Sequence, residues 1–217
     1  ITPSIIFDVT ALSAPSLSPD GARLAFVQSS IDRESMTTRS QIMVTDLATG
    51  ETARFTAGDK DAVPRYSPDG GSMAFVRPLK ADQGADRRQL WVMPTAGGEG
   101  RKLTSVPGGV TDVAWSPDSL SLAFVSDVDP DRLPDDHDPK ADPRVRVVRR
   151  IKYRGDTVGW RGDAFRHLFV VDAETGDARQ ITDGDGDDGA PAWSPDGARI
   201  AFISDRGPDR DVVSRTG

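Results

Sequence analysis

The sequence of 217 residues contains no cysteine. Disulfide bonds, cysteine ligands to a metal and thiol catalysis are therefore excluded. No apolar run approaches the roughly 20 residues that cross a bilayer. Residues 1–10 lack the basic start and following apolar stretch of a secretory signal. These absences predict a cytoplasmic protein that has no membrane partner.

Positive charge is also in short supply. The chain has 27 Lys and Arg against 34 Asp and Glu, which gives a formal net charge of −7. Such a balance does not attract a phosphate backbone, so no nucleic-acid partner is expected. Apolar residues make up 36%, enough for a packed core, and the 21 Gly and 16 Pro predict many tight turns.

A repeat dominates what is present. The tripeptide Ser-Pro-Asp begins at Ser18, Ser67, Ser116 and Ser194, and an apolar run follows each time. Gly follows the tripeptide in three copies and predicts a tight hairpin turn, because glycine takes a positive φ without a Cβ clash. Ser119 stands in its place in the third copy, so we expect a left-handed backbone or another turn type there. The apolar runs that follow the turns predict strands buried on both faces.

A second motif alternates with the first, at 41–50, 89–98 and 167–176, and each copy is followed by a short segment that ends in Thr. One period thus holds four strands, which is the content of a propeller blade. The sequence predicts an all-β fold, a partial β-propeller of about three and a half four-stranded blades. The predicted blades are 14–56, 63–104, 112–182 with an insertion at 127–166, and a half-blade at 190–203.

The open flanks of such a propeller would expose apolar sheet faces. We therefore expect residues 1–217 to be the N-terminal part of a larger propeller domain. The alternative is that two copies of the half-propeller associate through these flanks.

The insertion divides by charge into an acidic half, 127–142, and a basic half, 144–166. One interpretation is a solvated loop whose halves neutralise each other. The other is an element that docks a partner or lines the substrate path. The candidate residues for that role are Arg149, Arg150, Lys152, Arg154 and Trp160. Strand-like residues at 145–153 and 165–171 predict that part of the insertion forms an extended hairpin.

No catalytic set is complete. His167 takes the position of Gln41 and Gln89 in the other repeats, which predicts a structural strand residue. His137 sits in an acidic loop with nothing to hold it as a general base. No Gly-x-Ser-x-Gly motif and no cofactor-binding motif is present. We predict no catalytic and no cofactor-binding residue in this chain, and no cofactor.

The acidic run 182–189 is similar to the start of a calcium loop. However, Asp188 stands where that loop has Gly, and Ser194 stands where it has Glu. A turn between blades is favoured over a metal site, and no metal ligand is predicted. Trp115 and Trp193 belong to the repeat and are expected to pack between blades, whereas Trp160 is expected to be exposed.

The Ser-Pro-Asp-Gly repeat and the strand Leu-Phe-Val-Val-Asp at 168–172 resemble the propellers of two families. These are the N-terminal propeller of the prolyl oligopeptidase (S9) family of serine peptidases and the TolB-like periplasmic propeller. Residues 2–8, 149–154 and 190–211 are most similar to the acylaminoacyl-peptidase branch of the first family.

The peptidase resemblance implies a propeller that gates an α/β-hydrolase domain, which cleaves short or N-acylated peptides with a Ser, Asp and His triad. No residue here matches the triad, so this chain would filter substrates without cleaving them. Its partners would be the peptide substrate, through the parent enzyme, and the remaining propeller and hydrolase parts. The TolB resemblance implies instead a non-enzymatic scaffold for protein interactions.

Overall fold

The Ser-Pro-Asp copies form the turn between the first two strands of each four-stranded sheet and between the two strands of the last hairpin. The hydroxyl of Ser18 donates to Asp20 Oδ1 at 2.5 Å and accepts from the backbone N–H of Arg23 at 2.8 Å. The same two hydrogen bonds recur at Ser67, Ser116 and Ser194. Each turn is thus closed by its own side chains, a local feature that short sequence motifs specify.

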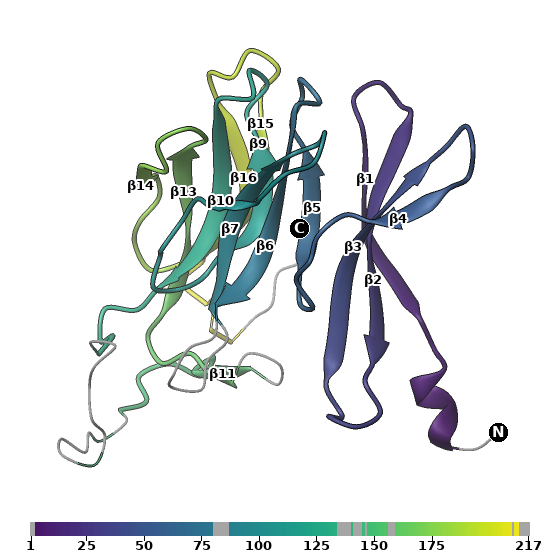
Figure 1. Ribbon diagram of the computed structural model, residues 1–217. Coiled ribbons are helices and arrows are strands. Elements are labelled where there is room, and N and C mark those ends of the chain that lie inside the picture. The colour runs from purple at the N-terminus through teal and green to yellow at the C-terminus, as the bar shows by residue number, and fades with distance from the viewer. Residues whose placement is uncertain are drawn as a thin grey trace.

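The computed structural model describes residues 3–79, 87–133, 140, 145, 147–155, 159–209 and 211–212. Within them, three four-stranded antiparallel sheets follow one another along the chain, and a two-stranded hairpin follows the third (Figure 1). The first sheet stands at the right of the view, the second in the middle and the third at the left. We call the sheets blades one to three and the hairpin the half-blade. The predicted partial propeller fold is confirmed.

The elements have the following bounds. Blade one follows the 3-10 helix η1 (Pro3–Phe7) and contains β1 (Ala11–Leu17), β2 (Arg23–Ile31), β3 (Thr38–Asp46) and β4 (Thr52–Arg54). Blade two contains β5 (Ala62–Tyr66), β6 (Ser72–Leu79), β7 (Arg87–Pro94) and β8 (Arg101–Lys102). Blade three contains β9 (Thr111–Trp115), β10 (Ser121–Val128), β13 (Phe165–Asp172) and β14 (Ala178–Gln180). The insertion holds the short pair β11 (Arg154–Gly155) and β12 (Gly159–Trp160), and the half-blade is β15 (Asp187–Trp193) with β16 (Ile200–Asp205).

A bulge with a positive φ interrupts the first strand of each repeat at the same place. The residues are Ala14, Val63, Asp112 and Ala190, with φ between 48° and 54°, and each lies where the pairing register shifts. A non-glycine residue in this region costs about 1–3 kcal/mol, so the surrounding packing must hold it. Four such bulges bend the first strands alike, which makes them part of the repeat.

Ser119 has the left-handed backbone that the sequence predicts, with a φ of 63°. Its hydroxyl accepts a hydrogen bond from the backbone N–H of Asp69 at 3.1 Å. Asp69 lies in the equivalent turn of the preceding blade. The serine therefore forms a link between blades that a glycine at this position could not form.

The core lies between the blades. One cluster joins blades one and two, and a second joins blades two and three. Phe75 in β6 and Phe124 in β10 are fully buried. The indole N–H of Trp115 donates to Arg65 O at 3.0 Å, and that of Trp193 donates to Ala114 O at 3.2 Å. Both tryptophans thus pack between blades, as predicted.

The half-blade departs from the predicted burial. Phe202 is 40% exposed and Ile203 is 64% exposed, whereas Phe124 and Val125, at the same repeat positions, are fully buried. The reason is that no third strand and no further blade covers β16 within the described part of the chain. An apolar face is therefore open on this flank.

We expect Phe124→Ala to lower the free energy of unfolding by about 3–5 kcal/mol, because it opens a cavity between two blades. The matched change Phe202→Ala removes a half-exposed ring and should cost about 1 kcal/mol. Chemical denaturation followed by tryptophan fluorescence measures both. Equal losses at the two positions would contradict the burial pattern.

Candidate functional site

The insertion does not form the predicted extended hairpin. The segment 165–171 becomes part of β13, but the strand predicted at 145–153 is wrong, since none of its described residues lies in a strand. Among the described residues, the short pair β11 and β12 is the one strand pair that lies wholly within the insertion. The basic side chains of this segment form ion pairs with acidic residues on several other segments. These ion pairs, rather than strand pairing, hold the segment in place.

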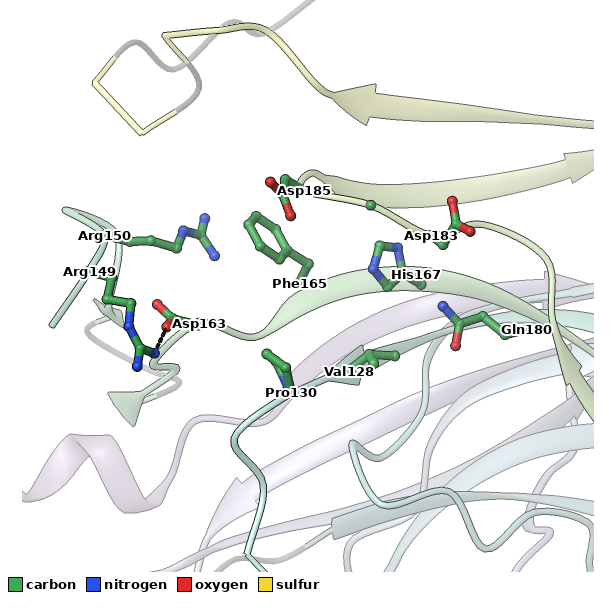
Figure 2. Close-up of a pocket in the computed structure, with 11 residues that line it drawn as sticks. Val128, Pro130, Arg149, Arg150, Asp163, Phe165, His167, Gln180, Asp183 and Asp185 are labelled. Carbon is green, nitrogen blue, oxygen red and sulfur yellow. Dashed lines mark hydrogen bonds and ion pairs between the residues drawn. The ribbon is translucent and has the colours of Figure 1, made fainter. Parts of the chain in front are cut away.

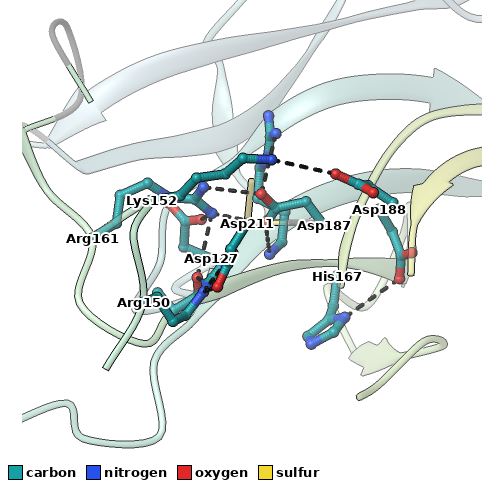
Figure 3. A network of polar contacts seen from close by, with 11 residues as sticks. Asp127, Arg150, Lys152, Arg161, His167, Asp187, Asp188 and Asp211 are labelled. Carbon is teal, nitrogen blue, oxygen red and sulfur yellow. Dashed lines mark hydrogen bonds and ion pairs between the residues drawn. The ribbon is translucent and has the colours of Figure 1, made fainter. Parts of the chain in front are cut away.

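Arg161 fastens the insertion to the half-blade. Its guanidinium donates to both carboxylate oxygens of Asp187, at 3.0 and 2.9 Å, and to Asp127 at the end of β10, at 3.3 Å (Figure 3). The backbone N–H of Arg166 also donates to Asp187, at 2.9 Å. Burial acts to raise the pKa of Asp187, but these hydrogen bonds outweigh it and hold the pKa well below its usual range. The carboxylate of Asp187 therefore stays ionised and joins three segments.

Arg150 makes a second attachment. It donates to the carboxylate of Asp211, with a shortest distance of 2.9 Å, and to the carbonyl of Ala164 at 3.0 Å. Its guanidinium carbon lies 3.9 Å from the ring centroid of Phe165. The side chain is largely buried, so the ion pair and the cation–π contact reinforce each other.

Arg149 and Lys152 also pair with acids of this chain. Arg149 contacts Asp131 at 2.7 Å and Asp163 at 2.5 Å. Lys152 lies 3.5 Å from Asp205 at the end of β16. The acidic half of the insertion therefore neutralises only some of its basic residues, because the half-blade supplies further carboxylates.

The remaining two candidates lie on the short pair. Arg154 is exposed on β11. Trp160 on β12 is 38% exposed, as expected, and stands edge-on to Tyr153 with ring centroids 5.4 Å apart. Neither is among the residues that line the cleft described next.

An open cleft of about 480 Å³ lies where the insertion meets the third blade (Figure 2). Arg149 and Arg150 line it, but Lys152 does not. The full lining is Val128, Pro130, Arg149, Arg150, Asp163, Phe165, His167, Gln180, Asp183, Gly184 and Asp185. The structure thus brings two of the five candidates together at one cleft.

His167 also lines the cleft, although the sequence predicted only a structural role for it. It is a buried residue of β13, as its repeat position indicates, and its Nδ1 lies 3.4 Å from Asp188 Oδ2. Asp188 also accepts from Ser204 and from Arg206, both at 2.6 Å. Burial acts to raise the pKa of Asp188, but these partners outweigh it and lower the pKa. The one available sequence signal for this site was that His167 stands where the other repeats have Gln.

The acidic run 182–189 forms the connection between blade three and the half-blade. Asp187 and Asp188 pair with arginines from other segments. Among the described residues, no group of three His, Cys, Asp or Glu side chains is arranged to hold a metal ion. His137 lies outside the described residues. No helix in the described part of the chain is long and apolar enough to cross a membrane.

A family model described as the TolB beta propeller domain matches residues 4–131. The chain belongs to the TolB β-propeller family. A curated relative, the uncharacterized peptidase YuxL of Bacillus subtilis, is 35% identical over 205 residues, which cover 93% of this chain and 31% of the relative. The resemblance to a peptidase propeller that the sequence predicts is confirmed by this match together with the fold.

Solved structures agree on the fold. The acylaminoacyl peptidase of Pyrococcus horikoshii superposes with a TM-score of 0.69 at 19% identity, over 90% of this chain and 28% of that one. A putative TolB from Agrobacterium tumefaciens superposes with a TM-score of 0.55 at 23% identity, over 90% of this chain and 59% of that one. The TolB-family chain described here therefore spans about a third of the length of YuxL and less of the archaeal peptidase.

We expect Asp187→Asn to destabilise this TolB-family propeller by about 2 kcal/mol at pH 7, because it leaves the buried Arg161 with only its longer contact to the carboxylate of Asp127. The pKa of Asp187 is lower in the folded than in the unfolded chain. Its contribution is therefore present above the unfolded pKa, near 4, and is lost as the pH falls below it. The difference between wild type and variant should shrink from pH 5 to pH 2 in urea denaturation. The control is Glu51→Gln, which removes an exposed carboxylate, and a difference that does not change with pH would contradict the assignment.

Proposed function

We propose that this chain is the N-terminal part of the propeller of a serine peptidase that resembles acylaminoacyl peptidase. The parent enzyme would hydrolyse short or N-acylated peptides, and this part would admit and filter substrates without cleaving them. The observation that carries the proposal is the 35% identity to a peptidase, YuxL, along 93% of the chain.

The insertion separates the peptidase from the scaffold interpretation. The TolB family model ends at residue 131, near the start of the insertion. The match to YuxL extends over 205 residues and so must include most of the insertion. Arg161 and Lys152 pair with acidic residues of the half-blade, so the insertion is attached to the propeller. The peptidase match therefore accounts for more of the chain.

The open flank fits a larger propeller. The exposed Phe202 and Ile203 occupy positions that are buried against neighbouring strands in blades two and three. In the proposed enzyme, the remaining propeller would cover them, and the hydrolase domain would supply the triad. Alternatively, a second copy of this chain would cover these two residues. The cytoplasmic location stays a prediction.

The second candidate is a TolB-like propeller that acts as a scaffold for protein interactions. It is favoured by the family model and by the superposition on the putative TolB over 90% of this chain. A scaffold would hold its partner without any covalent chemistry. The two functions therefore differ in a property that a serine-directed reagent detects.

We expect the protein purified from its natural source to have an intact mass well above 23.3 kDa. It should react with a fluorophosphonate probe, which labels an activated serine. It should also cleave N-acylated chromogenic peptides, with kcat/KM falling as the peptide is lengthened, because the propeller limits access. A denatured sample is the control for the labelling. A protein that is neither labelled nor active on any peptide of the series would favour the scaffold.

A further inference from the structure

One segment of the insertion has the composition of a strand but no strand to pair with. Residues 147–151 read Val-Val-Arg-Arg-Ile, and β-branched residues favour an extended chain. In the described structure these five residues lie outside every strand. None of their backbone N–H or C=O groups makes a hydrogen bond with another described residue. We call residues 147–151 the open segment.

The apolar side chains of the open segment face water. Val147 is 53% exposed, Val148 is 54% exposed and Ile151 is 69% exposed. Exposed apolar side chains that gather in this way mark a surface that binds a partner. Blade three has its four strands without this segment. The open segment thus offers main-chain donors and acceptors together with an apolar surface.

Two arginines hold the open segment on the propeller. Arg149 contacts Asp131 and Asp163, and the largely buried Arg150 contacts Asp211. The charges of both arginines are therefore compensated within this chain, so the segment does not select a charged partner. A segment that is fixed before binding loses less conformational entropy when a partner binds.

The cleft described above lies beside the open segment, because Arg149 and Arg150 belong to both (Figure 2). Val128, Pro130 and Phe165 make part of its lining apolar. In a β-strand, successive side chains point to opposite faces. A strand laid along the open segment therefore has one row of side chains on the side of the cleft and the other row facing away from it.

We propose that the open segment binds a substrate peptide as an added β-strand. The main chain of the peptide would pair with residues 147–151, and its apolar side chains would contact Val147, Val148 and Ile151. This mode of binding suits peptides of varied sequence, because the main chain supplies the hydrogen bonds. The inference rests on the proposed function for the source of the peptide. It extends that function by naming extended, apolar peptides as the class that this part of the propeller admits.

The unpaired edge of β16 is the competing place for such a strand. Ile203 in β16 is 64% exposed, close to the value for Ile151. In blades one to three, however, the second strand pairs with a third strand of the same blade. In a larger propeller, the edge of β16 therefore belongs to the rest of its own blade. The open segment has no such partner in the repeat, since it lies in the insertion.

The test is a calorimetric titration of the 217-residue chain with acetyl-Val-Thr-Val-Thr-Val dimethylamide. We expect saturable binding and slower hydrogen exchange at alternate amides of the open segment, because these amides pair with the peptide. The control peptide has the same side chains and an N-methyl group on every residue, so its main chain cannot donate. It should bind about tenfold more weakly, since it loses several hydrogen bonds. Equal affinity for the two peptides, or no saturable binding, would overturn the proposal.

Two matched variants locate the site. Ile151→Ser removes an exposed apolar side chain from the open segment and should weaken binding of the peptide about fivefold. Ile203→Ser makes the same change on β16, where the side chain is similarly exposed, and should leave the affinity unchanged. Wild-type affinity in Ile151→Ser, or a loss of affinity in Ile203→Ser, would refute the placement.

The oligomeric state shows whether a second copy of this chain occupies the open segment instead. A chain that is dimeric without peptide, and monomeric in Ile151→Ser, would assign the segment to self-association and overturn the proposal. The titration involves no catalysis, so a failure to bind is distinct from an absence of peptidase activity. An active parent peptidase whose propeller does not bind the peptide would remove this inference and leave the proposed function in place.

Discussion

Burial of apolar side chains on both faces of blades two and three is the constraint on which this propeller depends. In β6, four consecutive residues from Met73 to Val76 are buried, so neither face of the strand meets water. A sheet of that kind is stable only between two neighbours. The half-blade has its neighbour on one side within the described chain, and Phe202 is correspondingly exposed. Each blade is therefore stabilised by its contacts with the adjacent blades, and an apolar flank without a neighbour is exposed to water.

Polar contacts then fix how adjacent blades sit on one another. Trp115, Trp193 and Ser119 each make one hydrogen bond to a neighbouring blade, at the first strand or at its turn. Arg161 adds a buried ion pair between the insertion and the half-blade, and Arg150 adds one between the insertion and Asp211, which follows the half-blade. Buried, hydrogen-bonded pairs of this kind are costly to break, whereas the exposed pair of Arg149 with Asp131 contributes little. The insertion is thus held in place mainly by the buried ion pairs of Arg150 and Arg161.

The blades could be predicted from the sequence because their signals are local. The turn at Ser18 is closed by residues within five positions of it, and the same motif recurs in every repeat. The path of the insertion could not be predicted, because Arg150 and Asp211 are far apart in sequence and only the fold brings them together. The cleft was missed for the same reason, because its lining joins Val128, Arg150 and Asp183 from separate segments that only the fold brings together.

Because the repeats place equivalent residues in equivalent surroundings, each departure can be judged by whether its hydrogen bonds are replaced. Ser119 replaces a glycine, and its hydroxyl takes a partner in the preceding blade, so this departure maintains the fold. His167 replaces a glutamine whose three hydrogen bonds in blade two are all made to nearby groups. The imidazole of His167 contacts Asp188 in β15 instead. The serine thus adds a contact between two blades, whereas the histidine moves the polar contact of its position from the segment after the fourth strand to the half-blade.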